Sequence, residues 1–131
     1  RLGIDDVADK CPSQLSGGQR QRAAIARTLV LEPDLLLMDE PFSSVDAVTR
    51  EDLQNLTLSL CEEQGLTLVV VTHAIEEAVV LGRKILLLDA APTRIPSIFE
   101  NPSAGMHGHR ESKRYQELCN QLRREMQREA A

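Results

Sequence analysis

The sequence predicts an α/β fold in which helices flank a parallel β-sheet. The first observation is that three short apolar runs, 35–38, 67–71 and 85–88, are continuous rather than alternating, which is typical of strands buried on both faces. The second is that helical patterns separate the runs, as they do in right-handed parallel sheets. The third is that polar residues follow the runs, at the sheet edge where α/β proteins bind ligands.

Helical patterns occupy much of the first third of the chain. Residues 1–14 predict a short helix followed by a loop, because Pro12 interrupts their apolar spacing. The next helix is expected over 17–31. It should stop at Glu32, because Pro33 disfavours the helical conformation in the residue before it.

The rest of the chain alternates helices with the second and third runs. Asp46 predicts the N-cap of a helix that extends over 46–64, and residues 74–81 predict a shorter helix. A loop or an extended edge segment is expected over 92–110, which is rich in proline and glycine. Residues 111–129 predict an amphipathic helix whose apolar stripe we expect to dock on its own domain.

Composition excludes several classes of function. Fifteen basic and 20 acidic residues give a net charge of -5, so no nucleic-acid partner is expected. No apolar run approaches the length of a membrane span. The three cysteines have no C-x-x-C spacing, which favours neither disulfides nor zinc, and His107 and His109 are interpreted as loop histidines rather than half of a metal site. The cysteines are Cys11, Cys61 and Cys119.

Residues 15–19, L-S-G-G-Q, open the helix over 17–31. Two adjacent glycines leave backbone N–H groups uncovered at the positive end of the helix, where a phosphate can bind. Ser16 and Gln19 also fit a capping box, in which each side chain accepts a hydrogen bond from the other residue's backbone. Taken alone, the five residues favour the cap.

Asp39 and Glu40 follow the first apolar run and, on an extended chain, are expected to point to opposite sides. Mg²⁺ takes one or two carboxylates together with phosphate and water oxygens, and a second carboxylate can hold a water for in-line attack on phosphorus. A pair of solvated acids is the alternative. His73 follows the second run, where it can contact a phosphate or the attacking water, or simply bond a carbonyl.

Three segments together resemble the second half of an ABC-type ATPase subunit: Q-L-S-G-G-Q-R-Q-R, L-L-L-M-D-E-P-F-S-S-V-D and V-V-V-T-H. Each segment is a weak signal, but three in this order and spacing are specific. The resemblance covers about residues 1–100 and implies a partial P-loop NTPase-type sheet. It also implies ATP and Mg²⁺ as cofactors.

The resemblance gives a role to each matching residue. Asp39 supports Mg²⁺, usually through water, and Glu40 is the catalytic carboxylate that polarises the attacking water. His73 is the switch histidine. Asp46 lies in the loop that couples two ATP sites across a dimer, and it keeps its interpretation as a helix cap. A signature loop binds the γ-phosphate of ATP held by the opposite subunit of a head-to-tail dimer; its residues are Ser16, Gly17, Gly18 and Gln19.

No G-x-x-x-x-G-K-[ST] motif occurs in the 131 residues, so the Walker A strand and loop are not in this chain. We therefore expect the chain alone to bind ATP poorly and to be inactive, and the family's upstream half to precede Arg1.

The motifs divide the chain into segments with different roles. Residues 1–31 are expected to be the end of a helical subdomain, and residues 32–91 a catalytic α/β core. The remaining residues are expected to form a loop over 92–110 and a C-terminal helix over 111–131.

Two longer segments narrow the resemblance: P-F-S-S-V-D-A-V-T-R-E-D-L-Q and E-E-A-V-V-L-G-R-K-I-L-L-L-D-A-A-P-T-R-I. They resemble the ATPases of bacterial nitrate, sulfonate, taurine or bicarbonate-type importers. This implies a small solute, for example an anion such as nitrate or a sulfonate, and transmembrane permease subunits as partners. The subunit would be peripheral, at the cytoplasmic face of the inner membrane. Two residues differ from the pattern of these ATPases. Cys11 stands where an aromatic residue is common, and Ala74 stands where an aspartate often follows the switch histidine.

Two other functions stay open at this point. An ABC-type ATPase of DNA repair or translation would differ in segments upstream of this chain, although the E-E-A-V-V-L-G helix favours transport. A non-enzymatic interaction piece would expose a sheet edge and apolar surface. For that reason we expect the isolated chain to self-associate.

Overall fold

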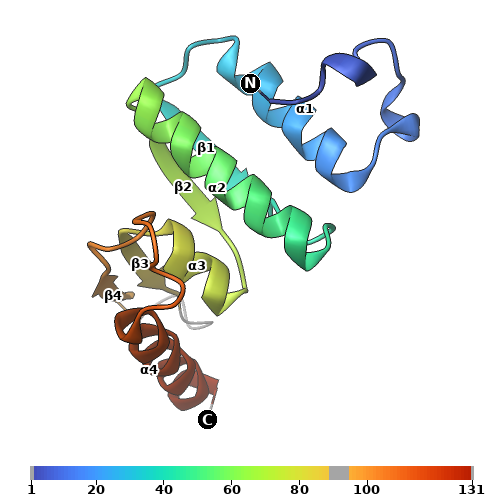
Figure 1. Ribbon diagram of the computed structural model, residues 1–131. Coiled ribbons are helices and arrows are strands. Elements are labelled where there is room, and N and C mark those ends of the chain that lie inside the picture. The colour runs from blue at the N-terminus through green and yellow to red at the C-terminus, as the bar shows by residue number, and fades with distance from the viewer. Residues whose placement is uncertain (1, 89–94, 131) are drawn as a thin grey trace. The chain divides into compact units, whose positions relative to one another are not determined.

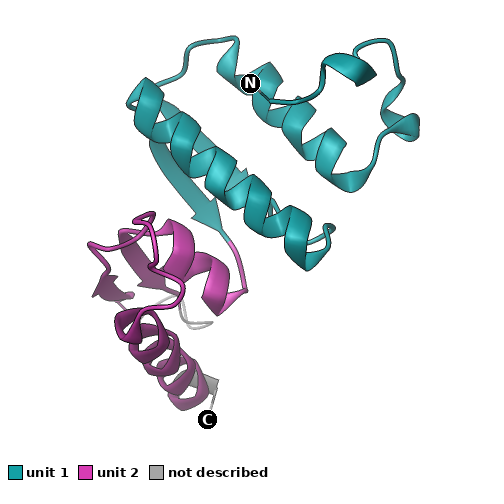
Figure 2. Cartoon of the chain, viewed as in Figure 1, with its two compact units in different colours: residues 1–71 teal, residues 72–131 magenta. Residues whose placement is uncertain are grey.

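The computed structural model describes residues 2–88 and 95–130. The chain divides into two compact units, unit 1 in residues 1–71 and unit 2 in residues 72–131 (Figure 2). The A-P-T-R-I segment, except for Ile95, lies outside the described residues.

Unit 1 contains a parallel strand pair joined by a helix (Figure 1). β1 (Leu35–Asp39) pairs in parallel with β2 (Thr67–Val71), and α2 (Ala47–Gln64) connects them. This confirms the parallel arrangement predicted from the first two apolar runs. The strands end in register, with Asp39 opposite Val71, so the residues that follow both strands start from one edge of the sheet.

The strand pair in unit 1 is buried on one face only. Leu36 and Met38 are buried, and α2 lies over the two strands in Figure 1. On the other face Leu37 is 68% exposed and Val71 is 56% exposed. The expectation of strands buried on both faces is therefore wrong for β1 and β2, because no element of unit 1, as described, covers the second face.

The start of the chain differs from its predicted short helix. It contains two 3₁₀ turns, Asp5–Val7 and Pro12–Gln14. Pro12 begins the second turn, where its missing N–H is not needed. Helix α1 (Gly17–Leu29) confirms the next predicted helix but ends before residue 31.

Unit 2 corrects the prediction for the third strand. It contains α3 (Ile75–Leu81), β3 (Lys84–Leu87), β4 (Ser97–Glu100) and α4 (Lys113–Ala130). β3 pairs antiparallel with β4 rather than extending a parallel sheet. β4 lies within the predicted loop over 92–110, so the extended edge segment is the alternative that the structure supports there.

Helix α4 packs on its own unit, as its apolar stripe predicts. Arg123 also forms an ion pair of 2.9 Å with Glu76 of α3 at the surface. Burial raises the pKa of Tyr115, in the first turn of α4, to about 12. The buried core that α4 shares with α3 and β3 consists of Val79, Ile85, Leu118, Cys119 and Leu122.

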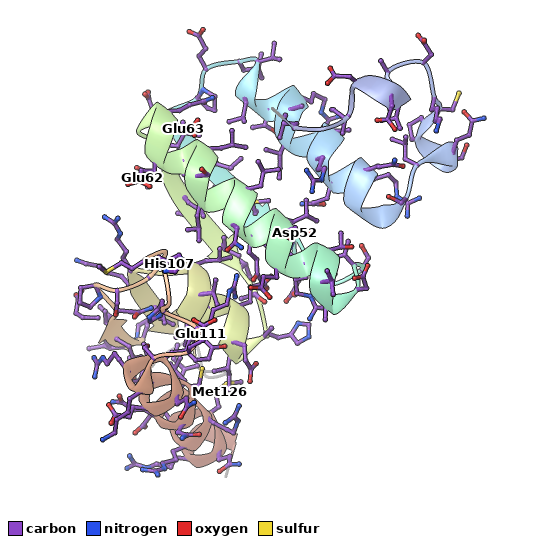
Figure 3. The ribbon with its side chains drawn as sticks, in the orientation of Figure 1. Asp52, Glu62, Glu63, His107, Glu111 and Met126 are labelled. Carbon is purple, nitrogen blue, oxygen red and sulfur yellow. The ribbon has the colours of Figure 1, made fainter. Side chains whose placement is uncertain are left out.

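Two buried polar side chains hold the segment between β4 and α4 in place. Asn101 Nδ2 donates to Val79 O at 2.7 Å and Gly82 O at 2.9 Å, and His109 Nε2 donates to Val79 O at 3.1 Å. His107, in contrast, is exposed (Figure 3). His109 thus anchors the segment to α3, and the sequence does not predict this role. No helix within residues 2–88 and 95–130 has the length and apolar character to cross a membrane.

Candidate functional site

The N-terminal end of α1 contains the capping box that its sequence predicts. Ser16 Oγ accepts from the Gln19 amide at 3.1 Å, and the Ser16 amide donates to Gln19 Oε1 at 2.9 Å. The Arg20 amide donates to Ser16 O. The amides of Gly17 and Gly18 belong to the first turn, which has no intrahelical acceptors. Because the Ser16 hydroxyl only accepts in this box, its proton can still be donated to an anion. The cap and a phosphate site are therefore compatible.

Gly17 and Gly18 also bring α1 into close contact with the chain that precedes α2. A Cβ on Gly17 would lie 3.2 Å from Ser44 O and 3.3 Å from Val45 Cγ1. A Cβ on Gly18, which is buried, would lie 2.7 Å from Thr49 Cγ2. Both glycines are thus needed for packing as well as for an open helix end. The sequence predicted only the open helix end.

Asp46 caps α2, as predicted, and holds the residue that faces Gly18. Its carboxylate accepts from the Thr49 amide at 3.0 Å and from Thr49 Oγ1 at 2.7 Å. Because these bonds fix Thr49, its methyl group cannot move away from α1 without breaking one of them. The structure therefore brings the signature loop and the Asp46 turn together within unit 1.

Asp46→Asn is expected to remove the acid-sensitive part of the α2 cap. The pKa of Asp46 is lowered below its ordinary value of 3.8, chiefly by the hydrogen bond from the Thr49 amide and next by the bond from the Thr49 hydroxyl. The carboxylate therefore stabilises the folded chain fully above pH of about 4 and loses this effect as the pH falls through the lowered pKa. Asparagine caps a helix without titrating. Thermal unfolding as a function of pH, followed by circular dichroism, should show the variant and wild type diverging at neutral pH and converging in acid.

The control is Asp52→Asn, an exposed aspartate on the same helix (Figure 3). It removes a carboxylate from the same helix without changing the cap, so its unfolding curves measure the general effect of an aspartate-to-asparagine change. A difference between Asp46→Asn and wild type that stays constant down to pH of about 2 would contradict the titrating cap.

Asp39 and Glu40 lie at the end of β1, but only Asp39 has strand geometry. Asp39 is exposed and is the last residue of the strand. Glu40 donates its amide to Val71 O at 2.8 Å and has a φ of 46°, in the left-handed region. The expected extended conformation is wrong for Glu40, so strand alternation does not decide how its side chain points. Such a conformation in a residue other than glycine costs roughly 1 kcal/mol or more and is concentrated at functional sites.

Glycine at Glu32 or Glu40 is expected to stabilise unit 1 by roughly 0.5 to 1 kcal/mol, because relief of the left-handed φ outweighs the entropy of glycine in the unfolded chain. Glu32 has a φ of 48° and also precedes a proline, which makes it the matched position outside the candidate site. Urea unfolding of both variants measures the effect. A loss of stability in Glu32→Gly would show that the left-handed residues are not strained.

His73 lies in unit 2, two residues beyond the end of β2, and is exposed. The next residue, Ala74, is the N-cap of α3 and makes no side-chain cap; its amide donates to Thr72 Oγ1 at 3.1 Å. An aspartate would be a strong N-cap at this position. The departure at Ala74 therefore removes a helix cap.

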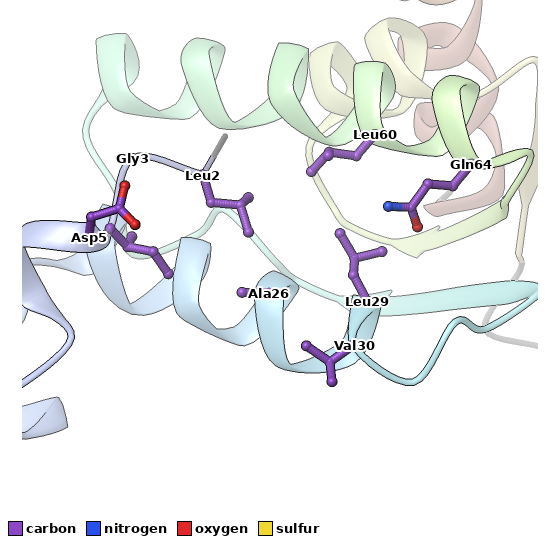
Figure 4. A pocket seen from close by; sticks show the side chains of 9 residues that line it. Leu2, Gly3, Asp5, Ala26, Leu29, Val30, Leu60 and Gln64 are labelled. Atoms are coloured by element: carbon purple, nitrogen blue, oxygen red, sulfur yellow. The ribbon is translucent and has the colours of Figure 1, made fainter.

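Unit 1 has an open pocket of about 380 Å³ (Figure 4). The C-terminal parts of α1 and α2 line it together with residues 2–5. It contains none of the candidate residues of unit 1, which cluster at the N-terminal ends of both helices and at the end of β1. The pocket is therefore separate from the candidate residues of unit 1.

The model of the ABC transporter family matches residues 1–43, which include the signature loop, Asp39 and Glu40. The taurine import ATP-binding protein TauB of Ruegeria pomeroyi is 45% identical over 104 residues, which are 79% of this chain and 39% of TauB. Over these residues the chain is similar to ATP-binding proteins of ABC transporters, and it spans less than half of the length of TauB. The bicarbonate transport ATP-binding protein CmpC of Synechococcus elongatus is 49% identical over 76% of this chain, which corresponds to 15% of CmpC. The aliphatic sulfonates import protein SsuB 2 of Agrobacterium fabrum is 49% identical over 67% of this chain and 34% of its own length.

Two solved structures share this fold over part of their own length. A metal-chelate type ABC transporter in an inward-facing conformation aligns with a TM-score of 0.68 and 33% identity, over 76% of this chain and 39% of that one. A dimeric ATP-binding cassette in a post-hydrolysis state, bound to ADP and inorganic phosphate, aligns with a TM-score of 0.55 and 45% identity, over 63% and 35%. The ABC ATPase fold predicted from the three motifs is confirmed over this part of the chain.

Proposed function

We propose that this chain supplies the signature loop, the acidic pair Asp39 and Glu40, and the switch histidine His73 of an importer's ATP-binding subunit. ABC ATP-binding subunits are ATPases in general. The observation that carries the proposal is the packing in unit 1 of the signature end of α1 against the turn that follows Glu40. The relatives are named for the import of taurine, sulfonates and bicarbonate, which favours a small anionic solute.

The residues at the end of β1 and at the start of α1 are suited to contact Mg²⁺ and the γ-phosphate of ATP. Asp39 is an exposed carboxylate at the end of a parallel strand, and Mg²⁺ takes such a ligand together with phosphate and water oxygens. The Ser16 hydroxyl and the amides of Gly17 and Gly18 suit the γ-phosphate of a nucleotide held by another subunit, while Gln19 closes the cap on Ser16.

The remaining residues act on the reaction itself. Glu40 orients and polarises the attacking water as a general base, and His73 hydrogen-bonds the phosphate or that water. The loop that contains Asp46 transmits the state of one ATP site to the other. The division by role, with the signature segment in 1–31 and the catalytic core in 32–91, belongs to the same proposal.

The proposal requires partners. Because no Walker A motif occurs in these 131 residues, the β-phosphate cradle must come from another segment. A second ATP-binding subunit in a head-to-tail dimer would complete each site. Permease subunits would hold the assembly at the cytoplasmic face of the membrane. The exposed apolar face of β1 and β2 supports the expectation that the chain alone self-associates.

The test joins this chain to the N-terminal part of TauB of Ruegeria pomeroyi that lies outside the aligned region. The chimaera is expected to hydrolyse ATP in the presence of Mg²⁺, whereas the 131-residue chain alone neither binds ATP at micromolar concentration nor hydrolyses it. Isothermal titration and phosphate release measure the two properties. Micromolar binding by the chain alone would contradict the proposal, and so would a chimaera that binds ATP without hydrolysing it.

A further inference from the structure

We propose that Arg50 is a positioning residue of the candidate ATP site. Its guanidinium holds the turn over residues 41–46 in one shape, so that Glu40 and the signature end of α1 keep a constant spacing. We call the two hydrogen bonds from the Arg50 guanidinium to this turn the Arg50 bracket. The effect on catalysis rests on the proposed function, whereas the bracket itself rests only on the geometry of unit 1.

The guanidinium of Arg50 bonds two carbonyls of the same turn. Nε donates to Phe42 O at 3.3 Å, and Nη2 donates to Val45 O at 2.9 Å. Phe42 is 1% exposed and anchors the turn in the core of unit 1. The planar fork of arginine can reach both oxygens at once, while the single ammonium of lysine cannot reproduce this pair of bonds.

The bracketed turn touches a functional element at each end. At its start, the Ser43 amide and Oγ both donate to Glu40 O, at 3.4 Å and 3.1 Å. At its other end, Ser44 O and the Val45 side chain are the atoms that a Cβ on Gly17 would meet. A change in the shape of this turn would therefore move the signature end of α1 relative to the carboxylate of Glu40.

Arg50 is itself held in the first turn of α2. Its amide donates to Asp46 O at 2.9 Å, and Asp46 caps the same turn through Thr49. The side chain is half-buried, which partly shields its two bonds from water. Arg50 thus connects the start of α2 to the carbonyls of the turn that precedes it.

Hydrogen exchange of the 131-residue chain tests the bracket without any nucleotide. In Arg50→Ala we expect roughly ten-fold faster amide exchange in peptides over 41–50 and 16–20, from the loss of two charge-assisted bonds. Arg50→Lys keeps the charge and the aliphatic stem and should give a smaller increase in the same peptides. It also serves as the test if the alanine variant does not fold. Arg27→Ala and Arg27→Lys, at an exposed arginine in the last turn of α1, are matched controls and should change neither peptide.

Faster exchange over 41–50 with unchanged exchange over 16–20 would overturn the inference, because the turn would then not control the signature end. Unchanged exchange in both peptides would overturn it as well.

Steady-state kinetics of the chimaera test the effect on the reaction. Both Arg50 variants should lower kcat by about 10- to 100-fold per folded molecule, the scale expected for a misplaced catalytic geometry, with little change in the KM for ATP. A role confined to stability would leave kcat per folded molecule unchanged, and this result would overturn the inference. A chimaera that is inactive with Arg50 intact would contradict the proposed function instead, and the exchange data would then decide the bracket alone.

Discussion

Glu40→Gln in the chimaera should abolish ATP hydrolysis while ATP-driven dimerisation persists. Glutamine keeps the shape of the side chain but loses the negative charge that polarises the attacking water and accepts its proton. Loss of a general base lowers the rate by roughly 10² to 10⁴-fold. The left-handed backbone of Glu40 is unaffected by this change, so the fold of the turn should be retained. Phosphate release and light scattering with and without ATP measure the two properties.

The matched control is Glu62→Gln, which removes the same charge from the exposed side of α2 (Figure 3). It should hydrolyse ATP at the rate of the parent chimaera. Unchanged turnover in Glu40→Gln would refute the catalytic role of Glu40. Loss of both dimerisation and turnover would instead indicate that the carboxylate is required for nucleotide binding.

Ser16→Arg is expected to prevent ATP-driven dimerisation, and with it all hydrolysis. Ser16 is exposed at the tip of α1, where the phosphate of a partner's ATP would have to approach. Arginine places bulk there, adds positive charge at the positive helix end and removes a cap worth about 1 kcal/mol. Because a second subunit must complete each ATP site in the proposed dimer, turnover should fall by at least the roughly 10²-fold that a large misplacement of catalytic groups produces.

Ser13→Arg is the control for this variant, since it introduces the same side chain at an exposed serine three residues upstream. It should dimerise normally. Size-exclusion chromatography with light scattering in the presence of ATP measures the effect, and circular dichroism checks that the variant is folded. Normal dimerisation of Ser16→Arg would refute the phosphate site contributed to another subunit.

The predictions that the structure confirms depend on residues close together in the sequence. The capping box of Ser16 and Gln19 and the cap of Asp46 on Thr49 join residues three apart, so local chemistry suffices to predict them. The parallel pairing of β1 and β2 followed from two apolar runs on either side of a helix.

The failed predictions concern strands whose neighbours lie elsewhere in the chain. β3 pairs antiparallel with β4, but the sequence places β4 only in a segment that is either loop or edge. The second faces of β1 and β2 are exposed, because apolar content predicts that a face can be buried without showing what covers it.

The sequence by itself determined the resemblance to ABC-type ATPases, the order of the motifs and the choice of candidate residues, since these depend on residue type and spacing. Only the tertiary structure decided how those residues are held. The contacts of Gly17 and Gly18 with the 44–49 segment and the two bonds of Arg50 depend on where the backbone of the turn lies in space. Glu40 adopts a left-handed conformation, for which a residue other than glycine has no preference of its own. Such geometry depends on packing around a residue, and the residue's own chemistry does not specify it.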